Sequence, residues 1–277
     1  MANFYDTHSH LDCPDFSDDL EGIIKRAHEA GVVRIISVGT DLDSSARAVQ
    51  IAERHPSVSA VVGWHPNDAL RAPDDLRPAL RTLAQHPKVV AIGETGLDYY
   101  RLPRETTVAD TADVIHIKQK QRDIFEQQME LAVELGLNCV VHQRGSLEDT
   151  LAQMTPYVGK LRAVFHCFSE APSVLARIMD MGFYASFTGI LTFKNAETVC
   201  ESLAAVPRDR FMLETDCPFL APIPYRGKRC EPAYLMETAK IAAEVRKCSL
   251  EDLSKETCGN ADRFFRRISV AKRQNHE

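Results

Sequence analysis

The sequence of 277 residues has no Cys-x-x-Cys pair among its eight cysteines and no apolar run long enough to cross a bilayer. Without paired cysteines, neither a zinc ribbon nor a thioredoxin-type redox motif is present, and we expect reduced thiols. The opening residues, MANFYDTHSHLD, lack the basic and apolar regions of a targeting signal. We therefore expect a cytoplasmic protein that does not contact a membrane.

A basic surplus is also missing, because 39 Asp and Glu residues outnumber 33 Lys and Arg residues and give a formal net charge of -6 at pH 7. Proteins that track along nucleic acid usually carry excess positive charge, so this balance argues against a long duplex footprint. A short anionic substrate is still compatible, because a bound divalent ion can dominate the local charge of a site. The composition, 44% hydrophobic and 26% charged, excludes disordered and fibrous classes.

Short β-branched runs alternate with amphipathic stretches along the whole chain, as strand–helix units do. Most of the runs are continuously apolar, which is typical of parallel strands buried on both faces. The strands are expected at Asn3–Thr7, Val33–Val38, Ser59–Trp64, Val89–Gly93, Asn138–Val141, Arg162–Phe165, Phe183–Phe187 and Arg210–Glu214. Eight such units predict an α/β protein with a (β/α)8 TIM barrel as one domain, residues 1–277. A doubly wound sheet would normally carry a glycine-rich phosphate turn after its first strand, and none is present.

Helices are predicted between these strands, and additional helices after them. Helical patterns occupy Asp18–Ala30, Ser44–Arg54, Lys118–Leu135 and Pro232–Val245, and Ser249–Arg267 predicts one or two extra C-terminal helices. The segment Leu102–Ile117 is too long for a usual loop and too polar for a core element. We interpret it as an insertion on the active face, either a lid over the substrate or an inert surface segment.

Metal-capable side chains stand at the ends of several predicted strands. Asp6, His8 and His10 close the first strand, where a period of two directs all three to one side. The carboxyl ends of barrel strands surround one mouth, so residues distant in sequence converge there. The predicted metal ligands are His8, His10, Glu94, His142, His166 and Asp216. Imidazole and carboxylate ligands suit Mg²⁺, Mn²⁺ or Zn²⁺, and six of them favour two ions over one.

Three of the residues at this mouth are candidate catalytic groups. Glu94 could bridge two ions that activate water for phosphoryl displacement. Asp216 could bind a metal ion and accept a proton from that water, or act only as a structural ligand. His65 could orient a phosphate or protonate a leaving oxygen; the alternative is an ordinary residue at a strand end.

Candidate substrate contacts are found on the loops beyond the strands. The loop Pro222–Arg229 carries Arg226, Lys228 and Arg229, which could receive phosphates or form a solvated charged loop. Aromatic residues near strand ends could stack an unpaired base or simply pack against the protein. These aromatic residues are Tyr99, Tyr100, Trp64 and Tyr225.

Six sequence blocks resemble one known family. They are DTHSHLD (6–12), GWHP (63–66), GETGLDYY (93–100), VVHQR (140–144), FHCFS (165–169) and LETDCPFLAP (213–222) with its RGKR continuation. The chain thus resembles TatD-type metal-dependent deoxyribonucleases of the amidohydrolase-like barrel group. The resemblance implies a (β/α)8 barrel, hydrolysis of DNA phosphodiesters and a divalent-metal centre. It also implies that His8, His10, Glu94 and Asp216 hold one ion, that Glu94 bridges to a second ion held by His142 and His166, and that His65 acts near the scissile phosphate.

The sequence departs from the family pattern at Gly145 after His-x-Arg, Glu170 after HCFS and Cys230 after RGKR, which affects the expected substrate preference. The leading hypothesis is a monomeric, two-metal deoxyribonuclease, an exonuclease acting on single-stranded DNA or exposed ends. A hydrolase of another ester, amide or lactone on the same centre is the alternative, although Glu94 occupies the bridging place where that wider group often has a carbamylated lysine. A non-catalytic barrel that binds nucleic acid or a partner has no need of six convergent metal-capable residues.

Overall fold

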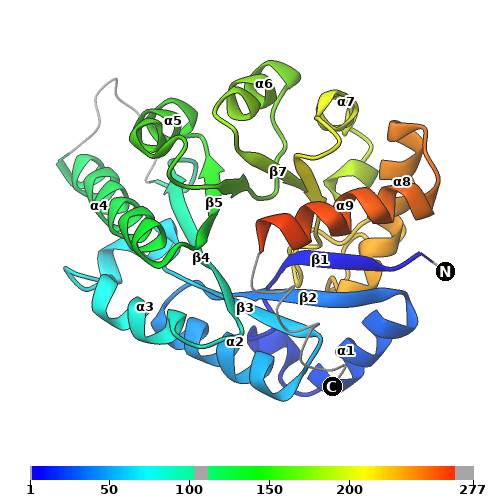
Figure 1. The fold of residues 1–277 in the computed structure, drawn as a ribbon, viewed down its shortest axis with the longest axis horizontal. Helices are drawn as coiled ribbons and strands as arrows, with labels where there is room; N and C mark the ends of the chain where they lie inside the picture. Colours follow the sequence, from blue (N-terminus) through cyan, green and yellow to red (C-terminus); the bar gives the residue numbers. More distant parts are fainter. Residues whose placement is uncertain (1, 103–111, 266–277) are drawn as a thin grey trace.

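The computed structural model describes residues 2–102 and 112–265 and contains an eight-stranded sheet. The strands follow one another in sequence order, and every neighbouring pair is parallel. Helices cover the outside of the ring of strands (Figure 1). Two backbone hydrogen bonds close the ring between β1 and the segment after β8. The His10 N–H donates to the Cys217 carbonyl oxygen over 2.8 Å, and the Asp216 N–H donates to the His8 carbonyl oxygen over 2.9 Å. The predicted (β/α)8 barrel is confirmed.

The element boundaries follow the alternation of apolar runs and amphipathic segments. The strands are β1 (Phe4–Ser9), β2 (Val32–Val38), β3 (Val58–Val62), β4 (Val89–Asp98), β5 (Asn138–Arg144), β6 (Ala163–Phe165), β7 (Tyr184–Phe187) and β8 (Phe211–Leu213). The α-helices are α1 (Leu20–Glu29), α2 (Leu42–Arg54), α3 (Arg77–Ala84), α4 (Ala112–Leu135), α5 (Leu147–Met154), α6 (Pro172–Asp180), α7 (Glu197–Ala205), α8 (Leu235–Arg246) and α9 (Leu250–Phe264). In the described residues, no helix combines the length and apolar character needed to cross a membrane.

The inside of the barrel is filled by a buried cluster to which all eight strands contribute. Ala261, Phe264 and Phe265 at the end of α9 belong to the same cluster. The ring of Phe264 lies 5.3 Å from that of Tyr184, the first residue of β7, and its carbonyl oxygen accepts from the Asn138 amide at the start of β5. The extra C-terminal helix therefore closes the barrel at the end where the strands begin, and leaves the opposite end for the site.

Two strands, β4 and β5, continue at their carboxyl ends well beyond the predicted bounds. β4 continues beyond Gly93 and β5 beyond Val141, because Gly96 pairs with His142 and Asp98 with Arg144. The pairing requires glycine at position 96, where φ is +131° and a Cβ would stand 2.0 Å from the His142 carbonyl oxygen. Glu94 and His142 thus lie within strands rather than just after them.

The predicted start of the fourth helix at Lys118 is wrong, because α4 begins at Ala112 and so takes in the end of the predicted insertion Leu102–Ile117. Residues 112–117 therefore form the first turns of a helix. Residues 103–111 lie outside the described residues. The prediction of a lid concerns that segment and stays a prediction.

Candidate metal centre

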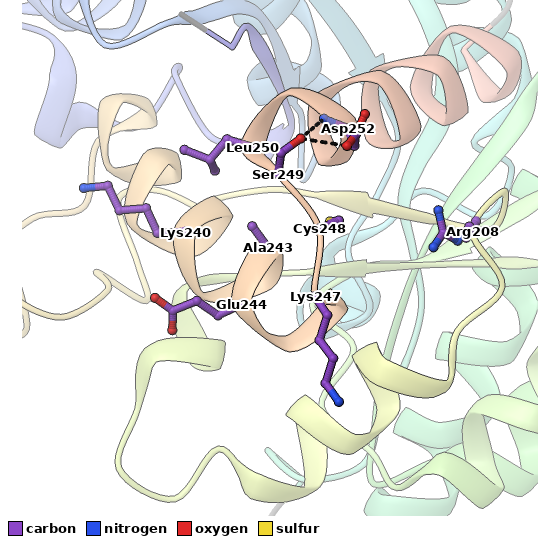
Figure 2. A pocket seen from close by; sticks show the side chains of 9 residues that line it. All are labelled: Arg208, Lys240, Ala243, Glu244, Lys247, Cys248, Ser249, Leu250 and Asp252. Atoms are coloured by element: carbon purple, nitrogen blue, oxygen red, sulfur yellow. Dashed lines mark hydrogen bonds between the residues drawn. The ribbon is translucent and has the colours of Figure 1, made fainter.

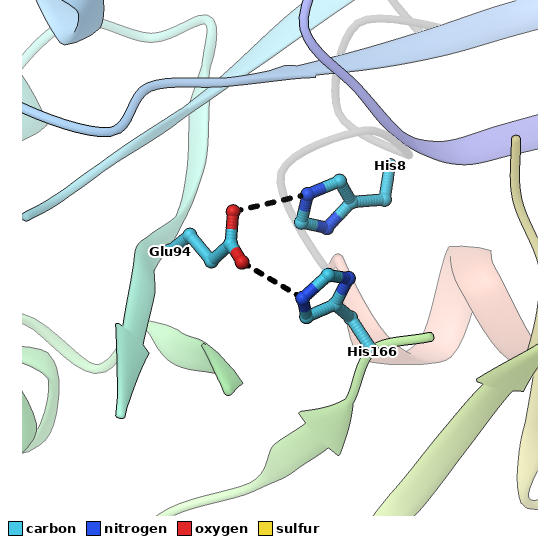
Figure 3. Close-up of side chains that lie close together, drawn as sticks. All are labelled: His8, Glu94 and His166. Atoms are coloured by element: carbon cyan, nitrogen blue, oxygen red, sulfur yellow. Dashed lines mark ion pairs between the residues drawn. The ribbon is translucent and has the colours of Figure 1, made fainter. Parts of the chain in front are cut away.

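Glu94 of β4 is the centre of a cluster of histidines at the carboxyl ends of the strands. Its side chain is only 4% exposed, and in the described residues all of its ion pairs are with imidazole nitrogens. Figure 3 shows the carboxylate beside the stacked rings of His8 and His166, with one oxygen toward each ring. A carboxylate surrounded in this way has no Lys or Arg counter-ion, so its charge is balanced only by groups that are also good metal ligands.

The two oxygens of Glu94 face different groups. Oε2 lies 3.4 Å from Nε2 of His8 and 3.7 Å from Nε2 of His10. Both of these nitrogens also face Asp216 Oδ1, at 3.8 Å and 3.4 Å. Oε1 instead lies 2.9 Å from Nδ1 of His142, 2.8 Å from Nε2 of His166 and 3.3 Å from Nε2 of His65. The two oxygens of one carboxylate therefore face two sets of imidazole nitrogens. In the described residues, three overlapping groups could hold a metal ion, and they are His8, Glu94 and His166, then His8, His10 and Asp216, and finally His65, Glu94 and His142.

Barrel closure places Asp216 beside the histidines of β1. Its backbone N–H donates to the carbonyl oxygen of His8, and it adopts φ 60°. This left-handed conformation is uncommon for residues other than glycine. The hydrogen bond from Asp216 to His8, which joins the segment after β8 to β1, stabilises it here. The carboxylate is thereby fixed on the same side as the imidazoles of His8 and His10.

The hydrogen bonds of the outer ring nitrogens determine which nitrogen faces the centre with a lone pair. Nδ1 of His10 donates to the Val38 carbonyl oxygen over 2.8 Å, which leaves Nε2 free to bind a metal ion. Nε2 of His142 lies 3.2 Å from the Asp98 carboxylate, which leaves Nδ1 toward Glu94. Such partners are typical of metal-binding histidines, because they fix the tautomer and orient the ring.

His65 shows the opposite arrangement. The backbone N–H of Asn67 donates to its Nδ1 over 3.0 Å. Because a backbone amide only donates, this Nδ1 carries the lone pair, and the neutral ring has its proton on Nε2. Burial lowers the pKa of His65, despite the opposing charge of Glu94, so the neutral form is favoured. In this tautomer Nε2 of His65 is a hydrogen-bond donor toward the centre, although the same nitrogen belongs to a group with Glu94 and His142 that could hold a metal ion.

The electrostatics of the cluster are those of a buried charge network. Burial acts against ionisation of Glu94, but the surrounding histidines, His166 first, hold its pKa well below the usual range. Burial likewise acts to lower the pKa of His10, but its bond to Asp216 and the charge of Glu94 raise it to about 9. Without a metal ion, protons on the imidazoles balance the carboxylates. A divalent ion can replace those protons without leaving the carboxylates unpaired.

The residues present fit a divalent-metal centre. The donor set is imidazole and carboxylate, the mixture that suits Zn²⁺ and Mn²⁺. Nδ1 of His8 is also buried and has no hydrogen-bond partner in the described part of the chain. The other nitrogen of this ring, Nε2, lies 3.3 Å from Nε2 of His10 and faces both Glu94 and Asp216. Converging imidazole nitrogens and carboxylate oxygens are the ligands that a divalent ion binds.

Two carboxylates that support the histidines were missed by sequence reasoning. Asp98 accepts from the backbone N–H groups of Tyr100 and Arg101 as well as facing His142. Glu214 accepts from the Cys167 N–H and from the Ser186 hydroxyl, each over 2.6 Å, and lies 3.5 Å from Nδ1 of His166. The available signal was an acidic residue four positions after Glu94 and another two positions before Asp216.

The prediction that Asp6 points to the same side as His8 and His10 is wrong. Its carboxylate accepts from the backbone N–H and the hydroxyl of Thr215, over 2.9 Å and 2.6 Å. Burial raises its pKa to about 8. The reason is an irregularity in the pairing of β1 with β2 between Asp6 and Ser9, which breaks the period of two on which the prediction depended.

Several predicted substrate contacts are engaged within the protein. The Arg229 guanidinium donates to Glu231 over 2.9 Å, and the Arg226 guanidinium donates to the Ala221 carbonyl oxygen over 3.1 Å and lies over Phe193. The Tyr99 hydroxyl donates to Asp149 over 2.7 Å. Lys228 is exposed on the same loop as the arginines.

The aromatic candidates also differ in exposure. Trp64 is buried, and the ring of Tyr225 stacks on that of Tyr234 with centroids 3.9 Å apart. Packing is therefore the role that the structure gives these two residues. Tyr100 is exposed, and the Arg144 guanidinium lies over its ring.

A separate hollow lies where α8 meets α9, at the end of the barrel where the strands begin (Figure 2). Ser249 caps α9 there by accepting from the Asp252 N–H and donating to its carboxylate. The nearby Arg208 is paired with Glu256. Within the described ranges, the groups that could hold a metal ion all lie at the other end of the barrel, so we place the chemistry there.

The chain is similar to known proteins along almost its whole length. A family model described as TatD related DNase matches residues 5–266. The uncharacterized metal-dependent hydrolase YabD of Bacillus subtilis is 37% identical over 95% of this chain and 98% of its own. A protein of Enterobacter lignolyticus named 3'-5' ssDNA/RNA exonuclease TatD is 34% identical, over 94% of this chain and 98% of its own.

The fold has a counterpart among solved structures. The crystal structure of the TatD homologue YjjV from Escherichia coli K12 matches with a TM-score of 0.85 and 26% identity, over 95% of this chain and 98% of its own. Sequence, fold and the cluster of metal-capable residues thus agree, and the chain belongs to the TatD-related DNase family of metal-dependent hydrolases.

Proposed function

We propose that this hydrolase is a two-metal exonuclease that removes nucleotides from ends of single-stranded DNA. The observation that carries the proposal is the division of the Glu94 oxygens between two sets of ligand atoms. The name of the Enterobacter relative supports the choice of substrate. The net charge of -6 favours a few nucleotides held at the mouth over a long duplex.

In this proposal His8, His10 and Asp216 would hold one ion together with the Glu94 carboxylate. His142 and His166 would hold the other with the same carboxylate. When bound, two such Mg²⁺, Mn²⁺ or Zn²⁺ ions supply Lewis-acid activation of water and stabilise charge on the phosphoryl oxygens. They would also reverse the sign of the local charge that the anionic substrate meets.

Asp216 and His65 have complementary roles in the proposal. Asp216 is 14% exposed, and although burial acts to raise its pKa, the bond from His10 and the nearby histidines lower it. It is therefore a carboxylate at neutral pH and can accept a proton from the attacking water. His65 presents Nε2–H, which can donate to a non-bridging phosphate oxygen and stabilise the charge that develops on it. A neutral imidazole is better suited to this donation than to protonating a leaving oxygen.

The test uses metal-free protein with single- and double-stranded DNA labelled at either end, with Mg²⁺, Mn²⁺ or Zn²⁺ added back singly. Single-stranded DNA should be shortened from one end in a metal-dependent manner. Glu94→Ala and Asp216→Ala should abolish the cleavage, while Glu148→Ala, which removes an exposed carboxylate on α5, should not. No metal-dependent cleavage by the wild type, or full activity in both variants at the centre, would contradict the proposal.

A further inference from the structure

Phe219 is an exposed aromatic residue at the edge of the candidate metal centre. It is 58% exposed, and its ring centroid lies 6.1 Å from that of His10, with the two planes at 66°. His10 in turn faces Asp216 and Glu94. A large apolar face is therefore presented to solvent directly beside the ligand atoms. Isolated exposed apolar residues are common on proteins, but one that borders a site needs an account of what it contacts.

The backbone around Phe219 is held on both sides. Its N–H donates to the Asp216 carbonyl oxygen over 3.0 Å, and the Cys230 N–H donates to the Pro218 carbonyl oxygen over 3.0 Å. The Leu220 carbonyl oxygen packs closely on Gly189, because a Cβ atom added to Gly189 would lie only 2.5 Å from that oxygen. The loop is thus fixed to the barrel while the ring remains outside, so the exposed face is presented in advance of any ligand.

We infer that Phe219 is a stacking platform for the unpaired base of the nucleotide next to the scissile bond. The inference rests on the proposed function and specifies its substrate. Every nucleobase has a π-face that can stack on an aromatic ring, so such a contact does not depend on the nucleotide sequence. Inside a duplex both faces of a base are covered by its neighbours, so a base of a single-stranded or frayed end can use the platform and an internal base pair cannot.

Among the described residues, two other aromatic side chains near the mouth have a ring face that is already in contact with the protein, although Tyr100 is also exposed. Tyr225 is stacked on Tyr234, and the Tyr100 ring is covered by the Arg144 guanidinium at 4.1 Å. Phe219 differs from both in that its exposed ring lies directly against a predicted metal ligand, His10. The phosphate would be bound by the centre and the base by the ring, so that the two contacts together position the end of the strand.

The test combines changes in the protein with a change in the substrate. Single-stranded oligonucleotides are compared with versions that are abasic at the terminal and penultimate positions, for wild type, Phe219→Ala, Phe219→Leu and Phe219→Tyr. If the stacking free energy is in the range usual for a base on an aromatic ring, removing the bases should raise the KM of the wild type about tenfold. Phe219→Ala and Phe219→Leu should raise KM for the intact strand by about the same factor, with less effect on kcat. Neither variant should then respond to base removal.

The conservative variant and a control separate stacking from a loss of folding. Phe219→Tyr retains an aromatic face and should keep a KM near that of the wild type. Val158→Ala, which changes a remote side chain 43% exposed, should leave both KM values unchanged. Equal KM values for wild type and Phe219→Leu on the intact strand would overturn the stacking platform while leaving the nuclease standing. A wild type that cleaves no oligonucleotide with any added metal would overturn both.

Discussion

Replacing His65 by alanine tests whether this residue donates a hydrogen bond or binds a metal ion. Its Nε2 lies 3.3 Å from Glu94 Oε1 and 3.4 Å from His142 Nδ1, which is also a distance compatible with a shared ion. The bond from Asn67 argues against that role, because it uses the Nδ1 lone pair and leaves the proton on Nε2. We therefore expect His65→Ala to retain as much metal as the wild type, whereas His142→Ala loses an ion.

The expected effect of His65→Ala on the rate follows from the same geometry. Loss of one donor aimed at charge in the transition state lowers kcat by about 10²–10³-fold, or about 2.7–4 kcal/mol. The side chain is 12% exposed, so water can partly replace it, and we expect the lower end of this range. Stability should fall by less than about 1 kcal/mol, because Asn67 is exposed and its N–H can bond to water.

The assay measures kcat on a labelled single strand, metal content by atomic spectroscopy and melting by calorimetry. His65→Gln is the matched variant, since its amide can donate, and it should recover part of the lost rate. A His65→Ala protein that binds one ion fewer would show that His65 is a ligand. A kcat within twofold of the wild type would refute the donor role as well.

Three further predictions concern the support of the centre and of the barrel. Asp98→Asn should weaken metal binding by about tenfold or more, because His142 loses a carboxylate partner. Calorimetric titration with the metal ion would check this, with Asp149→Asn as the control. An unchanged metal affinity would count against the role of Asp98. His10, whose pKa is raised to about 9, stabilises the metal-free protein fully below about pH 6.5 and loses that contribution as pH rises through 9. Metal binding must displace the His10 proton, so the affinity for the metal ion should fall as the pH falls from 9 to 6.5. The released proton can be measured by calorimetric titration in buffers of different ionisation enthalpy. A metal affinity that does not depend on pH would contradict this exchange of protons for the ion. Phe264→Ala should lower the free energy of unfolding by about 3–5 kcal/mol, because the fully buried ring closes the barrel. Denaturant unfolding would measure this change. A decrease below about 1 kcal/mol would mean that α9 is not needed for closure.

Local patterns were sufficient for the parts of this protein that depend on short-range periodicity. Continuous apolar runs predicted parallel strands, and their alternation with amphipathic segments predicted the barrel, because burial on both faces or on one face leaves a direct trace in the sequence. The ends of those runs also identified the residues that meet at the centre, from His8 to Asp216. Their convergence follows from the general geometry of a barrel and needs no detailed contact.

The direction and partners of individual side chains depended on the tertiary structure. Asp6 turned away from His8 because of a pairing irregularity in β1, and it bonds to Thr215, 209 positions along the chain. Glu231 likewise accepts from Arg26 of α1, 205 positions away in the sequence, as well as from the nearby Arg229. Such contacts join elements far apart in the sequence, and no local pattern records which group will be opposite.

What the sequence by itself determined is the family, the barrel and the set of candidate ligands, since these are expressed in residue types at strand ends. Only the tertiary structure decided how the set works: that Glu94 divides its oxygens between two groups, that His65 faces them with a proton, and that Phe219 stays exposed beside His10. The reason is physical. Tautomers, hydrogen-bond partners and exposure are properties of distances between side chains, and those distances exist only once the barrel has closed.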